Sequence, residues 1–426
     1  MEWSIYNYDF IDSKGVLFIY NSFTNNLLKI ADEKRKDILF CKKGDFSHPD
    51  KDFVEQLIRE SIIVENNREL YKQIKLERLL SRYNTRYLSL TIAPTLNCNF
   101  RCVYCYEKGR NNETLATSET LIDDIVDFVE SFDSTERLRI TWYGGEPLLK
   151  FDFIQDLTRR FLQIRSDYDA FIITNGYLLN SRVIKSLSDL HIRGIQITLD
   201  GLEETHNKRR PHVIRNNSFQ TIIHNMDELF DIYPDVSVYL RVNVDKTNED
   251  EYHQLYQFLN EKYGKYKIFI HPGYVTDDFS ETSNGACMLQ EERNTFVIDQ
   301  YDKYGLPMQM YPKTSFGECC ARHISSFVIG PNGELYKCWN DIGIKDKEIG
   351  HLNSFSLFDK NCLTYMLDND PLESEECEQC FFFPICHGGC PYNRIYKKES
   401  DSCTCFKNNL KRMLLRRIKK ETEDKL

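Results

Sequence analysis

The sequence has no apolar run long enough to cross a membrane. A membrane-spanning helix needs about 20 consecutive apolar residues, and no stretch of the chain approaches that length. The first four residues, Met1-Glu2-Trp3-Ser4, also lack the charged and then apolar layout of a secretory signal peptide. We therefore expect a cytoplasmic protein with no membrane partner.

Positive charge is also in short supply. The chain has 55 basic and 65 acidic residues, which gives a formal net charge of −10. Nucleic-acid-binding proteins usually carry a basic surface or stripe, so a nucleic-acid partner is not expected. The hydrophobic fraction of 41% is ordinary for a globular protein, and 426 residues suggest two or three domains.

Cysteine, in contrast, is abundant, and three cysteines share one short loop. The chain has 15 cysteines, which in a reducing compartment are more often metal ligands than disulfides. Cys98, Cys102 and Cys105 follow a predicted strand at Tyr87–Ile92 that Pro94 ends. In α/β barrels the loops at the carboxyl ends of the strands carry the chemistry. Three thiolates can hold an iron–sulfur cluster that keeps one iron open; a zinc site or three unrelated buried thiols are the alternatives.

The CxxxCxxC loop resembles that of the radical S-adenosylmethionine (SAM) enzymes. The resemblance implies that Cys98, Cys102 and Cys105 bind a [4Fe–4S] cluster that passes an electron into SAM. A 5′-deoxyadenosyl radical then forms and removes a hydrogen atom from the substrate. The implied fold is α/β, a partial (β/α)6 TIM-like barrel, and strands and helices alternate from Tyr87 to about Pro272 as this requires. The strands are predicted at Tyr87–Ile92, Leu138–Trp142, Ala170–Thr174, Gly194–Leu199, Val236–Val244 and Lys267–His271, with helices such as Ser118–Phe132 and Asp152–Ile164 between them.

Polar or glycine residues follow the predicted strands, where the family binds SAM. The tetrapeptide after the second strand resembles the GGEP motif that meets the SAM amino group, and its glycines allow close backbone approach; a common turn is the alternative. Arg210 ends an H-N-x-x-R pattern, which implies a partner for the SAM carboxylate, although a solvated basic loop has the same composition. For Arg241, side-chain packing inside the barrel is the alternative. The predicted SAM-binding residues are Gly144, Gly145, Glu146, Pro147, Thr174, Asn175, Thr198, Asp200, Arg210 and Arg241.

The cysteines of the last third, in the order from Cys319 to Cys405, resemble a SPASM domain. The resemblance implies two auxiliary [4Fe–4S] clusters, and hence three clusters in all. One would use Cys320, Cys338 and Cys390; the other would use Cys377, Cys380, Cys386 and Cys405.

Two features depart from the family pattern or leave it open. No cysteine precedes the Cys319–Cys320 pair closely, so the first auxiliary cluster has three protein ligands or is completed by Cys319 or Cys287. Cys403 is an alternative to Cys405. A zinc ribbon at residues 377–390 would leave Cys338 and Cys405 unexplained.

Residues 1–84 predict a small winged-helix-like module. It would contain a hairpin of Ser4–Phe10 and Val16–Tyr20, a short helix within Asn21–Ala31, and a short strand at Ile62–Val64, with helices that start near Asp50 and Leu70. It is similar to modules that bind a leader peptide as an extra strand; a plain cap on the barrel is the alternative. The predicted domains are thus residues 1–84, 85–275 and 276–426, the last ending in a helix.

The leading hypothesis from these resemblances is a peptide maturase that installs a thioether or carbon–carbon crosslink in a ribosomally made precursor peptide. Its electron donor would be a low-potential protein such as flavodoxin or ferredoxin. One alternative is an anaerobic sulfatase-maturing enzyme, which forms formylglycine. That family has an aspartate base directly after the G-x4-C cysteine and lacks the amino-terminal module. Here Trp339 occupies this position, and Asp341 is the candidate base.

The other alternative is a non-catalytic iron–sulfur protein that binds peptides or carries electrons. It would need the metal ligands but not SAM. The GGEP segment and the polar strand ends argue against it.

Overall fold

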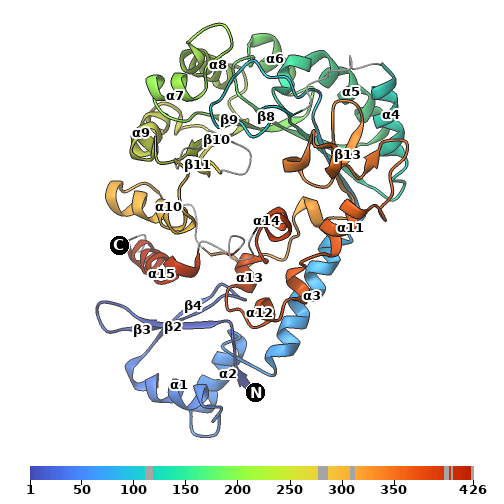
Figure 1. Cartoon of the computed structure of the whole chain (residues 1–426). Coiled ribbons are helices and arrows are strands. Elements are labelled where there is room, and N and C mark those ends of the chain that lie inside the picture. The colour runs from blue at the N-terminus through green and yellow to red at the C-terminus, as the bar shows by residue number, and fades with distance from the viewer. Residues whose placement is uncertain (111–118, 277–285, 308–311, 398–402, 404–405, 424–426) are drawn as a thin grey trace. The chain divides into compact units, whose positions relative to one another are not determined.

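The structure, a computed structural model, describes residues 1–110, 119–276, 286–307, 312–397, 403 and 406–423 (Figure 1). Its contacts divide the chain into two compact units. The barrel unit contains Asn84–Leu289 and Ile324–Tyr365. The terminal unit contains both ends of the chain and consists of Met1–Tyr83, Gln290–His323 and Met366–Leu426.

The barrel unit is built on a nine-stranded sheet in the order β11-β10-β9-β8-β7-β6-β12-β13-β14. Strands β6 to β11 are parallel neighbours, so the six predicted strands are confirmed. Strand β12 extends this sheet in parallel with β6 and turns back antiparallel into β13. The strands are β6 (Tyr87–Ile92), β7 (Arg137–Trp142), β8 (Asp167–Thr174), β9 (Ile192–Thr198), β10 (Ser237–Val244), β11 (Ile268–Tyr274), β12 (Ser326–Ile329), β13 (Glu334–Tyr336) and β14 (Gly350–His351).

Helices between the strands give the α/β architecture that the sequence predicts. Helix α5 shows why they pack on the sheet: Ile154, Leu157 and Phe161 are fully buried on one face. Burial of such apolar side chains contributes about 1.5–3 kcal/mol each. The helices are α4 (Glu119–Glu130), α5 (Phe151–Ile164), α6 (Ser181–Ser186), α7 (Glu203–Arg209), α8 (Ser218–Ile232) and α9 (Tyr252–Tyr263), and α11 (Lys360–Leu367) spans the boundary between the units.

The terminal unit joins the start of the chain to its end. Its amino-terminal part has a three-stranded antiparallel sheet, β2-β3-β4, and a separate pair, β1-β5. The helices that begin after Asp50 and Asn66 are confirmed, and each of these two side chains accepts hydrogen bonds from the first backbone N–H groups. The elements are β1 (Glu2–Trp3), β2 (Asn7–Ile11), β3 (Leu17–Asn21), β4 (Leu27–Ile30), α1 (Arg35–Lys42), α2 (Lys51–Arg59), β5 (Ile63–Val64), α3 (Asn67–Arg82), α10 (Gln290–Tyr304), α12 (Glu375–Glu378), α13 (Phe383–Cys386), α14 (Pro391–Tyr396) and α15 (Phe406–Glu423).

The helix predicted within Asn21–Ala31 is wrong, because Leu27–Ile30 forms strand β4 and pairs with β3. A tight turn precedes the strand. The Asn21 side chain accepts hydrogen bonds from the backbone N–H groups of Phe23 and Thr24, and Asn25 has a left-handed φ of 60°. Asparagine is one of the few residues that adopt this conformation readily, so the chain reverses where a helix would continue.

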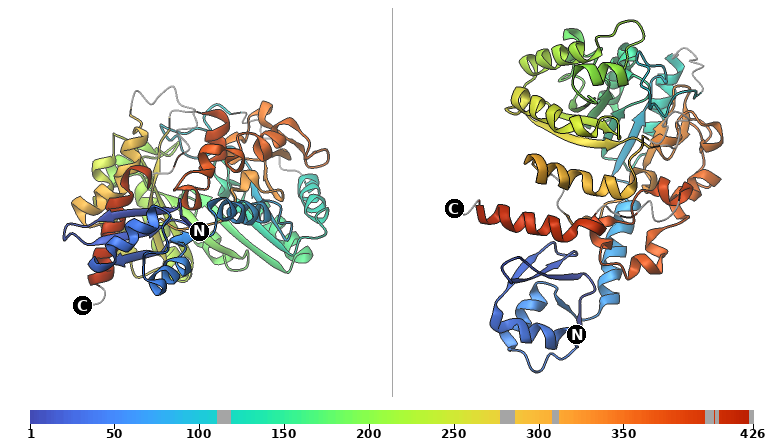
Figure 2. Two further views of the ribbon diagram at one scale, coloured as in Figure 1. Left: turned by 90° about the horizontal axis from the view of Figure 1, so that it is seen from below. Right: turned by 60° about the vertical axis from the view of Figure 1, so that its left-hand side comes forward.

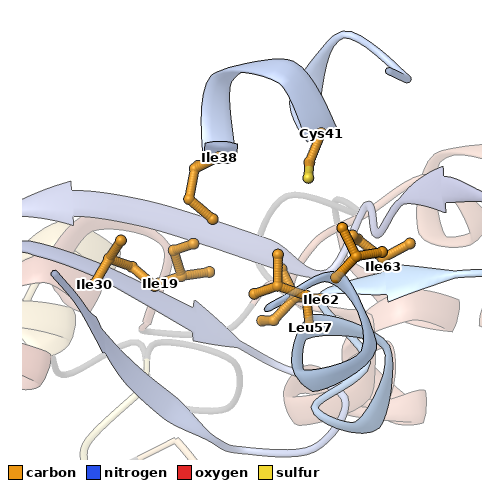
Figure 3. Close-up of a cluster of buried hydrophobic side chains, with 8 residues drawn as sticks. Ile19, Ile30, Ile38, Cys41, Leu57, Ile62 and Ile63 are labelled. Carbon is orange, nitrogen blue, oxygen red and sulfur yellow. The ribbon is translucent and has the colours of Figure 1, made fainter. Parts of the chain in front are cut away.

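Helices α1 and α2 pack their apolar side chains against this sheet (Figure 3). Ile38 and Cys41 from α1 meet Ile19 and Ile30 from the strands, and Leu57 comes from α2. Cys41 is fully buried in this cluster and behaves as a small apolar residue. The first part of the terminal unit therefore has its own hydrophobic core.

The carboxyl-terminal helix α15 confirms the predicted final helix and lies beside α10 (Figures 1 and 2). Arg412 of α15 forms ion pairs with Asp299 and Asp302 of α10, at 2.8 and 2.7 Å. Part of the basic face of α15 is thus paired with acidic residues. Among the described helices, none is long and apolar enough to cross a membrane.

Candidate functional site

The cysteine loop lies after β6, at the carboxyl edge of the parallel sheet. Cys98, Cys102 and Cys105 are half-buried free thiols. The Sγ of Cys98 accepts hydrogen bonds from the backbone N–H of Phe100, at 3.4 Å, and from Asn175 Nδ2, at 3.8 Å. Donors to a cysteine sulfur stabilise the thiolate that binds metal.

A neighbouring segment fixes the path of this loop. The backbone N–H groups of Arg101 and Val103 donate to the carbonyls of Pro211 and Arg209, at 2.9 and 3.1 Å. These bonds join the cysteine loop to the residues that follow α7. The H-N-x-x-R segment is therefore next to the cysteines, as the resemblance implies.

The two glycines of the GGEP segment are required by close contact with the chain before Cys98. Gly144 has a φ of +106°, and a Cβ atom on it would lie 2.4 Å from the carbonyl oxygen of Thr95. A Cβ atom on Gly145 would lie 2.4 Å from the carbonyl oxygen of Asn97. Side chains cannot be accommodated at such distances, so the glycines let β7 and the cysteine loop approach each other.

Glu146 ties the ends of two strands together. Its fully buried carboxylate accepts hydrogen bonds from Thr174 Oγ1 at 2.8 Å, from the N–H of Asn175 at 2.8 Å and from the N–H of Leu148 at 3.0 Å. Burial raises the pKa of Glu146, and these hydrogen bonds oppose the rise. The side chains of Glu146 and Thr174 thus bond to each other, and Pro147 starts the short helix that follows.

Tyr104, which the sequence analysis did not single out, connects several predicted site residues. Its hydroxyl donates to Asp200 Oδ2 at 2.5 Å and accepts from Arg210 Nη1 at 2.7 Å and Asn243 Nδ2 at 2.9 Å. Burial is the main reason why the Tyr104 pKa lies well above its ordinary value, so the hydroxyl keeps the proton that it donates. The feature of the sequence that could have indicated a role for Tyr104 is its position between Cys102 and Cys105.

The two adjacent arginines have different environments. Arg209 Nη1 donates to both carboxylate oxygens of Asp245, at 2.8 and 2.9 Å. Arg210 is 7% exposed, and its Nε is buried with no hydrogen-bond partner among the described residues. Burial raises the pKa of Cys102 to about 11, and the positive charge of the Arg210 guanidinium opposes this rise. Arg210 thus has a free donor beside the cysteine loop, which suits an anionic group.

The remaining predicted SAM contacts lie on β9 and β10, where Thr198 is opposite Arg241. The Nε of Arg241 donates to Asn243 Oδ1 at 2.8 Å, and a Cβ on Gly273 would lie 2.5 Å from the guanidinium. The structure therefore places most of the predicted SAM-binding residues at or just after the carboxyl ends of β7, β8 and β9, whereas Arg210 follows α7 and Arg241 lies within β10. Their contacts with SAM stay predictions.

The other cysteines divide between the two units. Cys338 belongs to the barrel unit. There the charges of Cys338 and Cys105 both contribute to raising the pKa of the Tyr143 hydroxyl. Cys287 is also in this unit and is buried. Cys405 lies outside the described residues. Besides Cys41, the described cysteines of the terminal unit are Cys319, Cys320, Cys377, Cys380, Cys386, Cys390 and Cys403.

Some cysteines of the terminal unit lie at a cavity of about 340 Å³. Cys319 and Cys386 line it. Cys320 is close enough to Cys319 to raise the pKa of Cys319, and Cys319 is close enough to Cys390 to raise the pKa of Cys390. The resemblance placed Cys386 in the other ligand set, so the division of ligands between the clusters stays a prediction. Four further residues of the wall were not predicted from the sequence: Arg78, Arg322, His387 and Arg394.

Cys380 marks a second grouping in the terminal unit. Cys377 and Cys403 both contribute to the rise in its pKa, so all three are near one another. In the described ranges, no three His, Cys, Asp or Glu side chains converge on a single ion. Thiolates of a cubane cluster bind different irons and stand further apart than the ligands of one ion.

The comparison with protein families decides the meaning of the first site. Residues 92–259 match the radical SAM superfamily. This range contains the cysteine loop, the GGEP segment and Arg210. The chain carries a radical SAM domain. The predictions of a radical SAM enzyme, a SAM-binding [4Fe–4S] cluster and bound SAM are confirmed at this level, whereas the number of auxiliary clusters stays a prediction.

Two curated relatives represent different reactions. A cysteine-type anaerobic sulfatase-maturating enzyme of Clostridium novyi is 25% identical over 345 residues, which cover 72% of this chain and 88% of that enzyme. A GTP 3′,8-cyclase of Campylobacter jejuni subsp. doylei is 29% identical over 225 residues. That match covers 52% of this chain and 64% of the cyclase, so the chain spans slightly less than two thirds of it.

Solved structures confirm the predicted fold. The structure of anSMEcpe with bound AdoMet is similar with a TM-score of 0.60 at 20% identity, over 77% of this chain and 94% of that one. Streptococcus suis SuiB bound to S-adenosylmethionine has a TM-score of 0.55 at 15% identity, over 94% of this chain and all of SuiB. The chain thus carries a radical SAM domain and shares its fold with both of these proteins.

The described residues fit the two cofactors. Three free thiols share one loop, and Asn99 Nδ2 and Arg210 Nε are buried beside it without hydrogen-bond partners. The cluster and SAM, when bound, supply a carbon radical that removes a hydrogen atom from the substrate. Cys98, Cys102 and Cys105 would hold the cluster, and Arg210 would hold the carboxylate of SAM.

Proposed function

We propose that the protein is a peptide maturase that removes a hydrogen atom from a precursor peptide and installs a thioether or carbon–carbon crosslink. The observation that carries this proposal is the extent of the fold shared with SuiB, 94% of the chain, against 77% shared with anSMEcpe. A structural match that covers 94% of the chain must include most of residues 1–84. SuiB has been solved with its precursor peptide SuiA.

The amino-terminal sheet supports a role in peptide binding. Its order is β2-β3-β4, so β2 and β4 are its edge strands. An edge strand can bind an extended peptide through backbone hydrogen bonds. We therefore assign the leader segment of the precursor to this sheet and the modified segment to the SAM site.

The environment of the candidate base disfavours the sulfatase-maturing reaction. Asp341 is 1% exposed, and its Oδ2 accepts a hydrogen bond from the Tyr365 hydroxyl at 2.6 Å. Burial raises the pKa of Asp341, and the hydrogen bond from Tyr365 opposes the rise. Trp339, at the position of the family's aspartate base, is 40% exposed and stacks on Tyr143 with ring centroids 5.6 Å apart.

The sulfatase-maturing reaction remains the second candidate because the Clostridium novyi enzyme aligns with 72% of the chain. That enzyme is of the cysteine type. A peptide substrate is common to both candidates, and anSMEcpe has been solved with the Kp18Cys peptide. The two candidates therefore differ in the product rather than in the substrate class.

The chain's own residues would bind SAM and keep it in place. Tyr104 links Asp200, Arg210 and Asn243, so the strand ends and the cysteine loop are held as one unit. Preorganised polar groups of this kind orient a cofactor without further rearrangement. A low-potential flavodoxin or ferredoxin as electron donor is part of the proposal.

The test is incubation of the reduced, cluster-loaded enzyme with SAM and either of two peptides. One is the product of a short open reading frame beside the gene; the other is a cysteine peptide from a sulfatase. A crosslink would lower the mass of the first peptide by two hydrogens and retain its sulfur. Conversion of the sulfatase peptide to formylglycine, with loss of sulfur and no change in the first peptide, would support the second candidate.

A further inference from the structure

The cavity of the terminal unit contains more positive than negative charge. Three arginines and one glutamate line it, and behind them a further arginine and an aspartate form ion pairs with the lining residues. These arginines are 1–7% exposed, and the side chains of the two carboxylates are 1% and 7% exposed. The four arginines are Arg78, Arg82, Arg322 and Arg394, and the two carboxylates are Glu318 and Asp370.

Within the described residues, ion pairs do not balance the charge of Arg78, Arg82 and Arg322. Glu318 pairs with Arg78 at 2.5 Å and with Arg82 at 3.5 Å, and Asp370 pairs with Arg82 at 2.6 Å and Arg322 at 3.4 Å. Two carboxylates therefore pair with these three arginines.

Some of the donors in this wall also lack an acceptor within the part of the chain that the structure describes. Arg78 Nη1 and Arg322 Nε are buried there without hydrogen-bond partners. A buried cation that is not fully compensated costs several kcal/mol. The arrangement is therefore expected to bind an anion at the cavity.

The same wall carries the cysteines of the terminal unit. Cys319 and Cys386 line the cavity, and Cys320 and Cys390 adjoin Cys319. An iron–sulfur cluster held by thiolates is an anion, and its charge becomes more negative on reduction. Its potential depends on that net charge and on the surrounding groups.

We propose that Arg78, Arg322 and Arg394 are the counter-charge of an auxiliary iron–sulfur cluster held at this cavity and that they raise its reduction potential. A positive environment favours the reduced cluster, because reduction adds a negative charge next to fixed cations. The cluster is thereby adapted to accept an electron rather than to supply one.

This role deepens the proposed function and rests on it for the source of the electron. After hydrogen abstraction, a substrate carbon radical and a substrate thiol form the new carbon–sulfur bond. The thiol proton leaves to solvent, and one electron passes to the auxiliary cluster. The cluster is reduced as the substrate is oxidised, so the step balances with one hydrogen atom taken by the SAM-derived radical.

The test measures reduction potentials of auxiliary clusters in the full chain after Cys98, Cys102 and Cys105 are changed to alanine. Arg322→Gln removes a positive charge and Glu318→Gln removes a negative charge from the same wall. Arg322→Gln should shift an auxiliary midpoint potential downward, and Glu318→Gln should shift it upward. Arg68→Gln, an exposed position of α3, is the control and should leave it unchanged.

Opposite shifts would separate an electrostatic role from a structural one. Potentials that do not move, or that move in the same direction in both variants, would overturn the proposal. Arg322 also donates to the carbonyls of Asp368 and Asn369, so Arg322→Gln can lose its iron through misfolding. In that case Arg322→Lys is measured, because it restores the positive charge. Recovery of bound iron in Arg322→Lys would support the proposal. Iron that is still lost, together with an unshifted midpoint potential in Glu318→Gln, would contradict it.

Failure of this inference can be told from failure of the proposed function. Unshifted potentials in variants of an enzyme that still crosslinks its peptide would reject only the arginine role. Opposite shifts in an enzyme that leaves its peptide unchanged would reject only the crosslinking reaction.

Discussion

Single side chains at the SAM site show where function and packing coincide. Glu146 and Thr174 were predicted as SAM contacts, and the structure shows them bonded to each other. Gly144 and Gly145 were predicted to approach SAM, and they approach the chain before Cys98. The GGEP segment thus positions the cysteine loop whether or not it also touches the cofactor.

Tyr104 gives the first prediction at this scale. Tyr104→Phe would leave Asp200, Arg210 and Asn243 without their shared partner, and each lost buried hydrogen bond costs about 1–3 kcal/mol. We expect SAM to bind at least about tenfold more weakly, which corresponds to about 1.4 kcal/mol. Equilibrium dialysis of the cluster-loaded protein measures this. Tyr177→Phe is the control, because it removes a hydroxyl that donates to Asn217 Oδ1 at 3.2 Å, and equal affinities in both variants would refute the prediction.

Gly145 gives the second. Gly145→Ala would place a Cβ atom 2.4 Å from the carbonyl oxygens of Leu96 and Asn97, so the cysteine loop must move. We expect less iron bound at Cys98–Cys105 and a loss of the SAM-dependent change in the electron paramagnetic resonance spectrum. Gly44→Asn is the control, because nothing lies within 4 Å of that glycine and asparagine accepts its φ of +79°. Full cluster occupancy in Gly145→Ala would show that the contact is not required.

Tyr104 marks what the sequence could not provide at the residue scale. The cysteines and Arg210 fit a known spacing, so the sequence sufficed to find them. An aromatic residue between two cysteines looks like ordinary packing, and only the fold brings Asp200 and Asn243 to it. Likewise, nothing in the sequence relates Arg78 to Arg322 and Arg394, which line one cavity although more than 240 residues separate the first from the others.

At the scale of elements, local pattern predicted most strands well. The six barrel strands alternate or run apolar and end at glycine or polar residues, so their positions could be inferred from periodicity. Strand β4 was missed because its short apolar segment suits a helix or a strand equally, and the Asn21 turn decides between them.

Helix α3 makes the stability of the terminal unit testable. Arg82 of α3 pairs with Asp370 at 2.6 Å, and both side chains are nearly inaccessible. Asp370→Ala would leave the buried Arg82 with only its longer ion pair to Glu318, at 3.5 Å, and should lower the free energy of unfolding by about 3 kcal/mol. Urea denaturation measures the change. Asp299→Ala removes a partner of Arg412 from a more exposed pair and should cost less than about 1 kcal/mol; equal losses would contradict the argument.

The same pair predicts a pH dependence. Burial tends to raise the Asp370 pKa, but the hydrogen bond and charge of Arg82 outweigh it, so the net pKa is lowered. Because the folded pKa is below the unfolded value of about 3.9, the stabilisation is complete above about pH 5 and is lost as the pH falls through the folded pKa. Unfolding of the wild type and Asp370→Asn should therefore converge on acidification, and a constant difference between them down to low pH would refute this.

At the scale of the whole chain, the sequence predicted the components but not their grouping. Residues 1–83 join with 366–426 in one unit, and 324–365 join the barrel. Such long-range associations leave no local periodicity, so composition and spacing cannot reveal them. The predicted boundaries at 84 and 275 follow chain order, whereas the compact units do not; whether these are also functional domains is a separate question.

The amino-terminal sheet leads to a prediction for the intact enzyme. If its edge strands bind a leader segment, a precursor without that segment should be modified with a kcat/KM at least about tenfold lower, since the tethering contribution to binding is lost. A leader supplied as a separate peptide should restore less of the rate. Kinetics with full-length and truncated peptides measure the difference, and equal values would make residues 1–84 a plain cap on the barrel.

The measurement that tests the central claim most directly is the fate of deuterium in the precursor peptide. The peptide is prepared with deuterium on its carbon atoms and incubated with SAM and the reduced, cluster-loaded enzyme. The predicted result is deuterium in the released 5′-deoxyadenosine together with a crosslinked peptide. That peptide has lost one deuterium if the bond is a thioether and two if it is a carbon–carbon bond. Deoxyadenosine without deuterium and a peptide of unchanged mass would contradict the proposal that this enzyme acts on peptide carbon.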